Sequence, residues 1–263
     1  MSTSHWTDFH RHWQRLKPPQ RPHPDVVAGV RKLLRGHDVS LLLLGVTPEL
    51  AGLGESLVAV DRNRTMIEHV WPGDGESRRA LQGDWCALPF PAQRFSAALG
   101  DGSANCLAYP EDYRRLLAEL ARVLRPGGRL VLRVYTSPER PEAVERLRRE
   151  ALAGRVESLH GFKWRLVSAM LAEAGSCNIP VAAILERFDA LFPDRSHLAE
   201  ASGWPAEDIA TIEGYRRSSE VYSFPTLDQF RAVLPPSFGD LRIASSGGYE
   251  LAERCPLVTL DLA

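Results

Sequence analysis

Three aspartates stand at the ends of predicted strands, a placement that is typical of a ligand site. Asp61 and Asp101 each close an apolar run, and Asp84 follows Gly83. In open α/β sheets a ligand binds beyond the carboxyl ends of the strands, where such side chains meet. A carboxylate there can accept hydrogen bonds from both hydroxyl groups of a ribose. The alternative interpretation is that these acids do no more than end their strands.

The segments that would position these aspartates alternate between apolar runs and helical patterns. The predicted strands are 39–45, 55–61, 95–101 and 129–135, and the predicted helices are 26–34, 64–71 and 110–125. This alternation predicts right-handed crossovers and a mostly parallel, doubly wound α/β sheet. Two further runs, 238–250 and 255–263, are joined by a short Gly-containing turn. They predict an antiparallel hairpin at the C-terminal edge of the sheet.

The chain divides into a core and two additions. Residues 38–136 and 222–263 form the predicted core. Residues 137–221 hold helical patterns without a clear strand, which predicts a helical insertion that caps the substrate site. The expected helices of this insertion are 142–153, 162–174 and 181–192. Residues 1–37 predict two N-terminal helices joined by a Pro-rich connector.

The first of these N-terminal helices carries an aromatic stripe. Trp6, Phe9 and Trp13 recur at helical spacing. Such a stripe is typical of a helix that packs against the rest of the protein. The alternative hypothesis is a lid over the ligand site.

Four segments, taken in this order, resemble the class I S-adenosylmethionine (SAM)-dependent methyltransferases. They are LLLLGVTPELA (41–51), VAVDRNRTMI (58–67), GDWCALPFPAQRF (83–95) and LARVLRPGGRLVL (120–132). The resemblance covers about residues 38–136 and 222–263. It implies a Rossmann-like seven-stranded sheet, SAM as the cofactor, and methyl transfer as the reaction.

The same resemblance assigns roles at the adenosine end of SAM. Asp61 is similar to the family's ribose-binding acid, and Arg62 lies where a side chain commonly flanks the adenine. Asp84 resembles the acid that accepts a hydrogen bond from the adenine amino group. Trp85 beside it can supply a stacking face.

At the methionine end the chain departs from the family pattern. The usual acid of the first strand is absent, and the Gly-rich turn is reduced to Gly45, followed by Val-Thr-Pro-Glu. Thr47 can offer a hydroxyl group in place of the missing glycines. Asp101 and Gly102 end the strand next to the expected methionine portion. Arg133, within the following strand, is a candidate compensating charge; its alternative is a structural ion pair.

A polar segment just before the core resumes is the predicted substrate contact. Tyr215, Arg216 and Tyr222 can recognise a carboxylate or phosphate on a small substrate. Together with Arg133 they form the predicted substrate-binding set. The alternative is a polar hinge between the insertion and the core.

Composition limits the partners. Lys and Arg number 32 against 33 Asp and Glu, so the formal net charge is −1. A protein that binds phosphate backbones needs a basic face, so nucleic acid is not an expected partner. The four cysteines form no CxxC pair, and the apolar runs are too short to cross a membrane. We expect a cytoplasmic protein with a small-molecule substrate and no metal site. A homodimer is a candidate assembly.

The expected reaction needs little chemistry from the protein, because the sulfonium of SAM already makes the methyl group electrophilic. No catalytic residue is predicted; Asp101, Tyr109 and His160 are candidates for a general base. Two alternatives stay open. The altered first loop can steer attack to the aminocarboxypropyl chain, by transfer or by cyclisation, with methylthioadenosine as product. The chain can also be a non-catalytic partner protein with a SAM-binding fold.

Overall fold

The computed structural model describes residues 5–216 and 218–263, and its centre is a seven-stranded sheet of order β3-β2-β1-β4-β5-β9-β8. The strands are β1 Ser40–Leu44, β2 Ser56–Asp61, β3 Arg78–Gln82, β4 Phe95–Asp101, β5 Leu124–Arg133, β8 Arg242–Ala244 and β9 Leu257–Asp261. The first five run parallel, whereas β9 is antiparallel to both β5 and β8. The predicted mostly parallel, doubly wound sheet with an antiparallel edge is confirmed.

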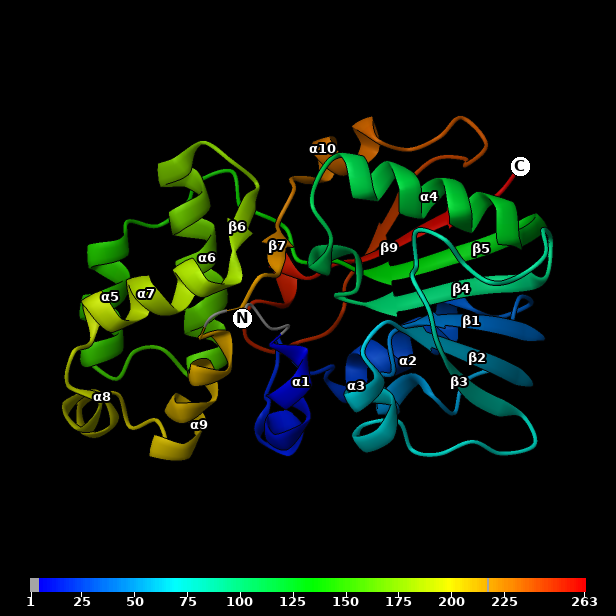
Figure 1. Ribbon diagram of the computed structural model, residues 1–263. Coiled ribbons are helices and arrows are strands. Elements are labelled where there is room, and N and C mark those ends of the chain that lie inside the picture. Colours follow the sequence, from blue (N-terminus) through cyan, green and yellow to red (C-terminus); the bar gives the residue numbers. More distant parts are fainter. Residues whose placement is uncertain (1–4, 217) are drawn as a thin grey trace.

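Helices cover both faces of this sheet (Figure 1). On one face α2 (Pro24–Leu33) and α3 (Arg64–His69) pack against the side chains of Leu41 and Leu43. On the other face α4 (Glu111–Val123) and α10 (Leu227–Ala232) pack against Leu42 and Leu44. Successive residues of a strand point to opposite faces, so the run of four leucines in β1 is buried on both sides.

The insertion is a separate group of helices beside the carboxyl ends of the core strands (Figure 1). Its helices are α5 Val144–Leu152, α6 Leu159–Ala174, α7 Val181–Leu191, α8 Arg195–Ser202, α9 Ala206–Ala210 and the short η4 Thr211–Tyr215. The first three match the expected helices. The helices α8 and α9 stand in a part of the insertion for which no helix was predicted.

The insertion also contains a strand that the sequence did not reveal. The strand β6 (Asn178–Pro180) pairs antiparallel with β7 (Val221–Ser223). Three residues are too few to show a period of two, and β6 contains a proline, so this pair depends on tertiary contacts. At the C-terminus, β8 has only three residues, and residues 245–256 with η5 (Ala252–Arg254) connect it to β9. This connection is longer than the short turn that we expected.

The N-terminal segment, defined here as residues 5–23, lies between the cap and the core (Figure 1). It contains α1 (Trp6–Phe9) and η1 (His10–Arg15). The helix α1 contacts both α3 of the core and η4 of the cap. No helix in the part of the chain that the structure describes is long and apolar enough to span a bilayer.

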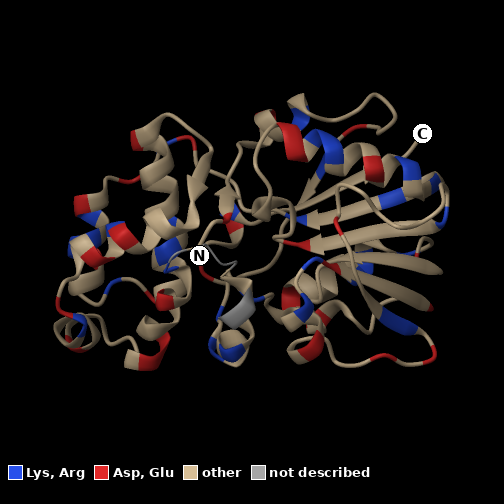
Figure 2. Cartoon of the chain, in the orientation of Figure 1, with Lys and Arg blue, Asp and Glu red and all other residues tan. Residues whose placement is uncertain are grey.

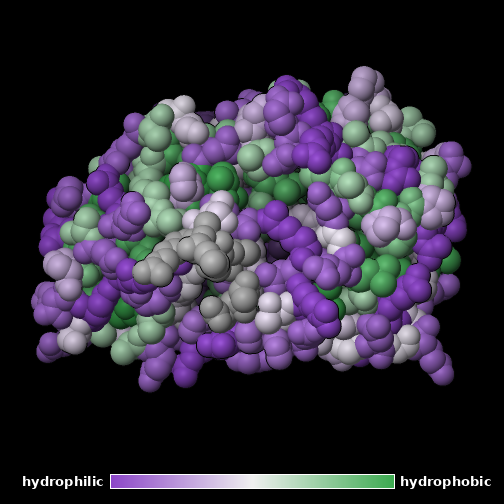
Figure 3. Space-filling model, viewed as in Figure 1, coloured by the Kyte–Doolittle hydropathy of each residue, from purple (hydrophilic) through white to green (hydrophobic). Residues whose placement is uncertain are grey.

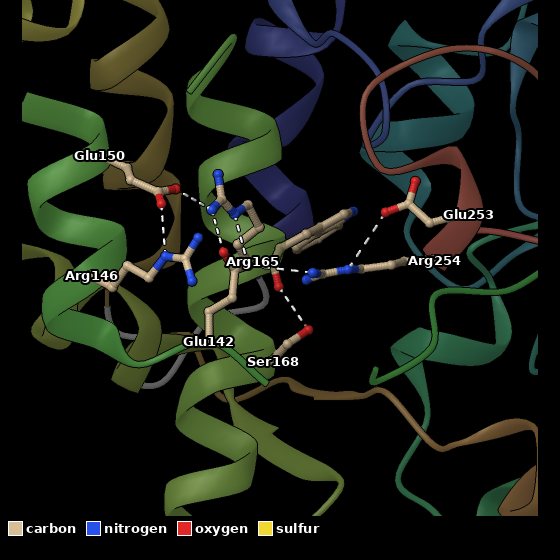
Figure 4. Close-up of polar contacts among 8 residues, drawn as sticks. Glu142, Arg146, Glu150, Arg165, Ser168, Glu253 and Arg254 are labelled. Carbon is tan, nitrogen blue, oxygen red and sulfur yellow. Dashed lines mark hydrogen bonds and ion pairs between the residues drawn. The ribbon is translucent and has the colours of Figure 1, made fainter. Parts of the chain in front are cut away.

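An ion-pair network within the cap extends to the core through Arg254 (Figure 4). Glu142, just before α5, accepts hydrogen bonds from Arg165 of α6 and, at 3.3 Å, from Arg254 of η5. Arg165 also donates to Glu150, 2.5 Å away. Charge-assisted hydrogen bonds of this kind contribute to stability and also fix the orientation of the two side chains. The Glu142–Arg254 pair therefore joins the cap to the core just beyond the carboxyl end of β5, where the Thr136 N–H donates to the Arg254 carbonyl at 2.9 Å.

A second contact joins the cap to the loop after β8. Ser158, the N-cap of α6, accepts a hydrogen bond from the Gly161 N–H and donates one to Glu250 at 2.9 Å. A Cβ atom at Gly161 would lie 2.2 Å from a Glu250 carboxylate oxygen. The glycine lets the carboxylate approach the N-terminus of α6, where negative charge is favourable.

Candidate functional site

A cavity lies at the carboxyl ends of β1, β2 and β4, between the sheet, the N-terminal segment and the cap. It contains about 1030 Å³ of empty space, including its open mouth. This is the position at which open α/β sheets bind ligands. Eight predicted cofactor residues line it: Gly45, Thr47, Asp61, Arg62, Asp84, Trp85, Asp101 and Gly102.

Asp61 is partly buried at the end of β2 and faces Gly45. One carboxylate oxygen accepts the backbone N–H of Asn63 at 2.8 Å. Burial raises the pKa of Asp61 to about 6, and the Asn63 hydrogen bond and Arg62 oppose this shift. Gly45 has a φ of 96°, and a Cβ there would lie 3.9 Å from the other Asp61 oxygen. The glycine therefore keeps open the space beside a carboxylate that can accept hydrogen bonds.

Trp85 is fixed by the neighbouring strand. Its indole N–H donates to the Val60 carbonyl at 2.6 Å, and its ring lies 3.8 Å from the place of a Cβ on Gly45. Asp84 is more exposed and accepts the Cys86 N–H at 2.8 Å. Arg62 pairs with Glu220, which precedes β7, so this contact joins the core to the cap at the cavity. One end of the cavity is thus surrounded by the Trp85 ring, the carboxylates of Asp61 and Asp84, and the Arg62 guanidinium.

Asp101 and Arg133 form a buried ion pair. The Arg133 guanidinium donates to both Asp101 carboxylate oxygens, with the Nη2–Oδ2 distance at 3.0 Å, and it also donates to the hydroxyl groups of Tyr135 and Tyr249. Burial raises the pKa of Asp101, and the Arg133 charge opposes the shift. Gly102 next to it cannot carry a Cβ, which would lie 2.6 Å from the Tyr135 ring.

This ion pair corrects one expectation. Asp101 lines the cavity, but Arg133 is not among the residues that do. Its side chain is fully buried, and its donors are used by Asp101 and the two tyrosines. Arg133 is therefore placed as a structural partner of Asp101 and not as a charge that contacts substrate.

The polar segment before β7 is also corrected in part. Tyr222 lines the cavity, whereas Tyr215 and Arg216 do not. Tyr215 is fully buried behind the cavity wall, and Arg216 is exposed and paired with Glu213. Tyr215 and Tyr222 contact each other, with ring centroids 6.0 Å apart, but Arg216 is paired with Glu213 instead. The three side chains therefore do not line the cavity together as the predicted carboxylate or phosphate site.

Among the candidate bases, only Asp101 lies at the cavity. Tyr109 and His160 are absent from its lining. Burial lowers the pKa of His160 to about 2, and its Nδ1 lies 3.0 Å from Gln20 Oε1. Lys163 donates to the same oxygen at 2.7 Å, and burial lowers its pKa to about 7.

The N-terminal segment and the cap side contribute an aromatic wall to the cavity. We use this name for Trp6, Phe9, Trp13, Trp164, Tyr222 and Phe224. The N-terminal members support the lid hypothesis, since they line the cavity. Trp164 of α6 and Phe224 were not predicted, nor was Gln20, which also lines the cavity. Because α6 is buried on nearly all sides, its pattern does not single out the residue that reaches the site.

The residues present fit a SAM-type cofactor. Asp61 offers a partly buried carboxylate beside the open space at Gly45, and Trp85 offers an anchored ring. Ser103, also at the cavity, has a buried hydroxyl group with no hydrogen-bond partner in the described part of the chain. Such an atom is suited to a polar ligand. Among the described residues no group of three or more His, Cys, Asp or Glu side chains is placed to hold a metal.

Part of the chain is similar to known methyltransferases. Residues 44–132 match the sequence model of the family described as "Methyltransferase domain". The chain is 34% identical over 93 residues to a ubiquinone/menaquinone biosynthesis C-methyltransferase of Hahella chejuensis, covering 35% of this chain and 34% of that one. It is 32% identical over 164 residues to a demethylmenaquinone methyltransferase of Mycolicibacterium vanbaalenii, covering 60% and 62%. The match thus spans about one third to three fifths of these relatives.

A solved structure shares the fold across the whole chain. It is a protein of Rhodobacter sphaeroides described as a Zn-dependent alcohol dehydrogenase, with a TM-score of 0.62 and 13% identity. The alignment covers 98% of this chain and 97% of that one. At this identity the likeness concerns the fold alone.

Proposed function

We propose that this chain, whose residues 44–132 match the model of a methyltransferase domain, is a class I SAM-dependent enzyme that transfers the methyl group of SAM to an uncharged small molecule. The main support for the proposal is that one side of the cavity is lined by charged side chains and the other by aromatic side chains. The core wall presents charged side chains at strand ends, and the aromatic wall faces it.

The core wall is the proposed cofactor side. Asp61 would accept hydrogen bonds from the ribose hydroxyl groups, and Trp85 with Arg62 would flank the adenine. Asp84 would accept a hydrogen bond from the adenine amino group. Gly45, Thr47, Asp101 and Gly102 would surround the methionine portion. When bound, SAM supplies an electrophilic methyl group on its sulfonium. The protein's part is then to orient the acceptor and to exclude water.

The aromatic wall is the proposed acceptor side. The charged residues of the cavity lining, among the described residues, are Asp61, Arg62, Asp84 and Asp101, and all belong to the core. The aromatic wall offers flat apolar surfaces instead, which suit a flat, uncharged acceptor. The relatives' names refer to demethylmenaquinone, a ring compound, and this supports an acceptor of that general shape.

Charge and surface support a small-molecule enzyme of the cytoplasm. Basic and acidic residues are interspersed over both halves of the molecule (Figure 2), and hydrophilic residues predominate on the face seen in Figure 3. A phosphate backbone needs a basic face, so nucleic acid is not a proposed partner. A homodimer stays a prediction that size-exclusion chromatography with light scattering would check.

Product analysis tests the proposal. The purified protein is incubated with SAM and a small-molecule metabolite extract, and the sulfur-containing products are identified by mass spectrometry. Methyl transfer predicts S-adenosylhomocysteine together with a metabolite that has gained a methyl group. Methylthioadenosine would instead indicate use of the aminocarboxypropyl chain. If SAM is neither bound nor consumed, the chain acts as a non-catalytic partner protein.

A further inference from the structure

Three successive residues of the N-terminal segment are bonded to the core at the cavity. The middle one, Gln20, lines the cavity. The Pro19 carbonyl before it accepts a hydrogen bond from the Tyr135 hydroxyl group at 3.1 Å. The Arg21 guanidinium after it donates to the Glu49 carboxylate at 2.5 Å. The segment is therefore attached to the core on both sides of a residue that lines the cavity.

The first of these bonds reaches the core beside Asp101. Tyr135 lines the cavity, and its ring lies 2.6 Å from the place of a Cβ on Gly102. Its hydroxyl group also accepts a hydrogen bond from Arg133 at 3.1 Å, and Arg133 is paired with Asp101. The same hydroxyl group thus joins the Asp101–Arg133 ion pair to the backbone of the N-terminal segment.

The second bond reaches the core at the neighbouring strand end. Glu49 lies in the loop after β1, and β1 pairs with β4 so that Leu44 is opposite Gly100. This loop therefore begins next to Asp101. Burial raises the pKa of Asp101, and the Glu49 charge adds to the rise, in agreement with a short separation. The Arg21 and Glu49 side chains are 27% and 20% exposed, so their ion pair is partly shielded from water.

Glu49 belongs to the part of the chain that departs from the family pattern. In place of a glycine-rich turn, Gly45 is followed by Val-Thr-Pro-Glu, and Glu49 is the last of these residues. Glycines let a backbone approach a ligand closely, so their loss leaves this end of the cavity with less cover from the core itself. The bond to Arg21 brings the N-terminal segment to this same place.

We propose that residues 19–21, which we call the clasp, cover the amino-acid end of the cofactor in place of the missing glycine-rich turn. Arg21, Glu49 and Tyr135 are the positioning residues that hold the clasp against the core. This inference rests on the proposed methyl transfer, which puts the methionine portion of SAM beside Asp101 and Gly102. The clasp makes binding selective for a ligand that carries the amino acid, because the adenosine portion alone does not reach it.

A matched pair of ligands tests this selectivity without turnover. S-adenosylhomocysteine and methylthioadenosine share the adenosine and the thioether sulfur, but only the former carries the amino acid. Calorimetry measures both affinities. Arg21→Gln is expected to weaken binding of S-adenosylhomocysteine about threefold to tenfold, the contribution of one hydrogen bond, and to change that of methylthioadenosine less than about twofold. Lys17→Gln is the control, because Lys17 attaches the same segment to Asp208 of the cap, 3.1 Å away. It should leave the ratio of the two affinities unchanged.

Tyr135 provides a second variant with its own control. Tyr135→Phe removes the bond to the Pro19 carbonyl and keeps the ring at Gly102, so it should lower the affinity ratio about threefold to tenfold. The Tyr249 hydroxyl group also accepts from Arg133, at 3.0 Å, but its other neighbour is Ser246. Tyr249→Phe should therefore leave the ratio unchanged. Equal effects of the two variants would assign the loss to Arg133 and overturn the role of the clasp.

A double variant separates the clasp from direct contact of Arg21 with the ligand. If Arg21 and Glu49 act through their bond, Glu49→Gln lowers the affinity ratio as Arg21→Gln does, and the second change adds less than about twofold to the first. If Arg21 bound the carboxylate of the ligand itself, Glu49→Gln would leave the ratio unchanged or raise it. That result overturns the inference.

Hydrogen–deuterium exchange measures the clasp directly. The backbone N–H groups of Gln20 and Arg21 donate to the Lys17 carbonyl at 3.0 and 3.2 Å, so their exchange reports on the order of this segment. At saturation, S-adenosylhomocysteine should slow exchange in the peptide that contains them more than methylthioadenosine does. In Arg21→Gln the two ligands should slow it equally.

The outcomes distinguish this inference from the proposed function. Equal protection of the clasp by both ligands in wild type, or an unchanged affinity ratio in Arg21→Gln and Tyr135→Phe, overturns the inference while S-adenosylhomocysteine still binds. Failure of wild type to bind either ligand overturns the proposed function itself.

Discussion

The two walls of the cavity are positioned by different means. On the core wall, Asp61 and Asp101 stand at the ends of buried parallel strands, so the sheet's hydrogen bonds fix them. On the aromatic wall, Tyr222 is held by His5, which is 217 residues away in the chain. The comparison shows a cofactor side placed by regular structure and an acceptor side placed by contacts between distant segments. The position of the cofactor side can be predicted from the sequence, whereas that of the acceptor side depends on how the cap packs against the core.

The largest predicted effect is at Asp61. Its pKa in the folded protein, about 6, lies above the ordinary value, so the folded state loses stability relative to the unfolded state as the pH rises from about 4 to 6. Asp61→Asn removes that cost and should raise the unfolding free energy at pH 7 by about 2 kcal/mol. The same change should weaken S-adenosylhomocysteine binding about 100-fold, because two charge-assisted hydrogen bonds are lost.

Urea unfolding and calorimetric titration measure these two changes. Asp228→Asn is the control, because the Asp228 side chain is 90% exposed and Asp228 is not among the residues that line the cavity. A variant at Asp61 that binds the cofactor product as tightly as wild type would contradict the placement of the cofactor on the core wall.

The next effect concerns the attachment of the cap. Glu142→Gln removes the charge that Arg165 and Arg254 share, and should lower the unfolding free energy by about 2 kcal/mol, because two partly buried guanidinium groups lose their partner. Binding of S-adenosylhomocysteine should change little, since the core wall is unaffected. Glu253→Gln is the matched control: Glu253 also pairs with Arg254 but is exposed, so its loss should cost under about 0.5 kcal/mol. Equal effects of the two variants would show that the network in Figure 4 does not hold the cap.

A smaller effect should appear as a pH dependence at Lys163. Burial lowers its pKa to about 7, below the ordinary value of 10.5. Between these values the unfolded state binds more protons, so wild-type stability rises with pH. Relative to Lys163→Met, the wild type should gain about 1 kcal/mol in unfolding free energy from pH 7 to pH 8. Denaturant titrations at both pH values measure this gain. Exposed Lys32→Met should show none, and a constant difference for Lys163→Met would disprove the buried placement.

The smallest effect is expected at the pair that joins the two walls. Glu220→Gln weakens the contact with Arg62, whose side chain is 53% exposed. An exposed pair of this kind contributes about 0.5 kcal/mol. We expect a change of that size in unfolding free energy and about a twofold faster release of S-adenosylhomocysteine in stopped-flow measurements. A tenfold faster release would mean that this pair, and not the aromatic wall, closes the cavity.

The sequence predicted the core in detail because each of its signals is local. Four apolar residues followed by Gly45 indicate a buried strand, and an aspartate at a strand end needs no distant partner to be recognised. The same locality explains the errors. Arg133 has no local signal that distinguishes a substrate contact from a partner of Asp101, because that choice depends on a neighbouring strand.

The aromatic wall was only partly predictable for the opposite reason. The spacing of Trp6, Phe9 and Trp13 indicated one apolar face, but not what it would cover. Trp164 lies on a helix that is apolar on nearly all sides, so periodicity cannot identify the residue that reaches the cavity. The pairing of His5 with Tyr222 joins residues 217 positions apart, and nothing in the intervening sequence indicates it.

A crystal structure with bound S-adenosylhomocysteine tests the division of the cavity most directly. The account predicts the ribose hydroxyl groups on the Asp61 carboxylate, the adenine beside Trp85, and open space between the sulfur and Tyr222. If the ligand lies instead against the aromatic wall, with Asp61 free of contact, the assignment of cofactor and acceptor to the two walls is wrong.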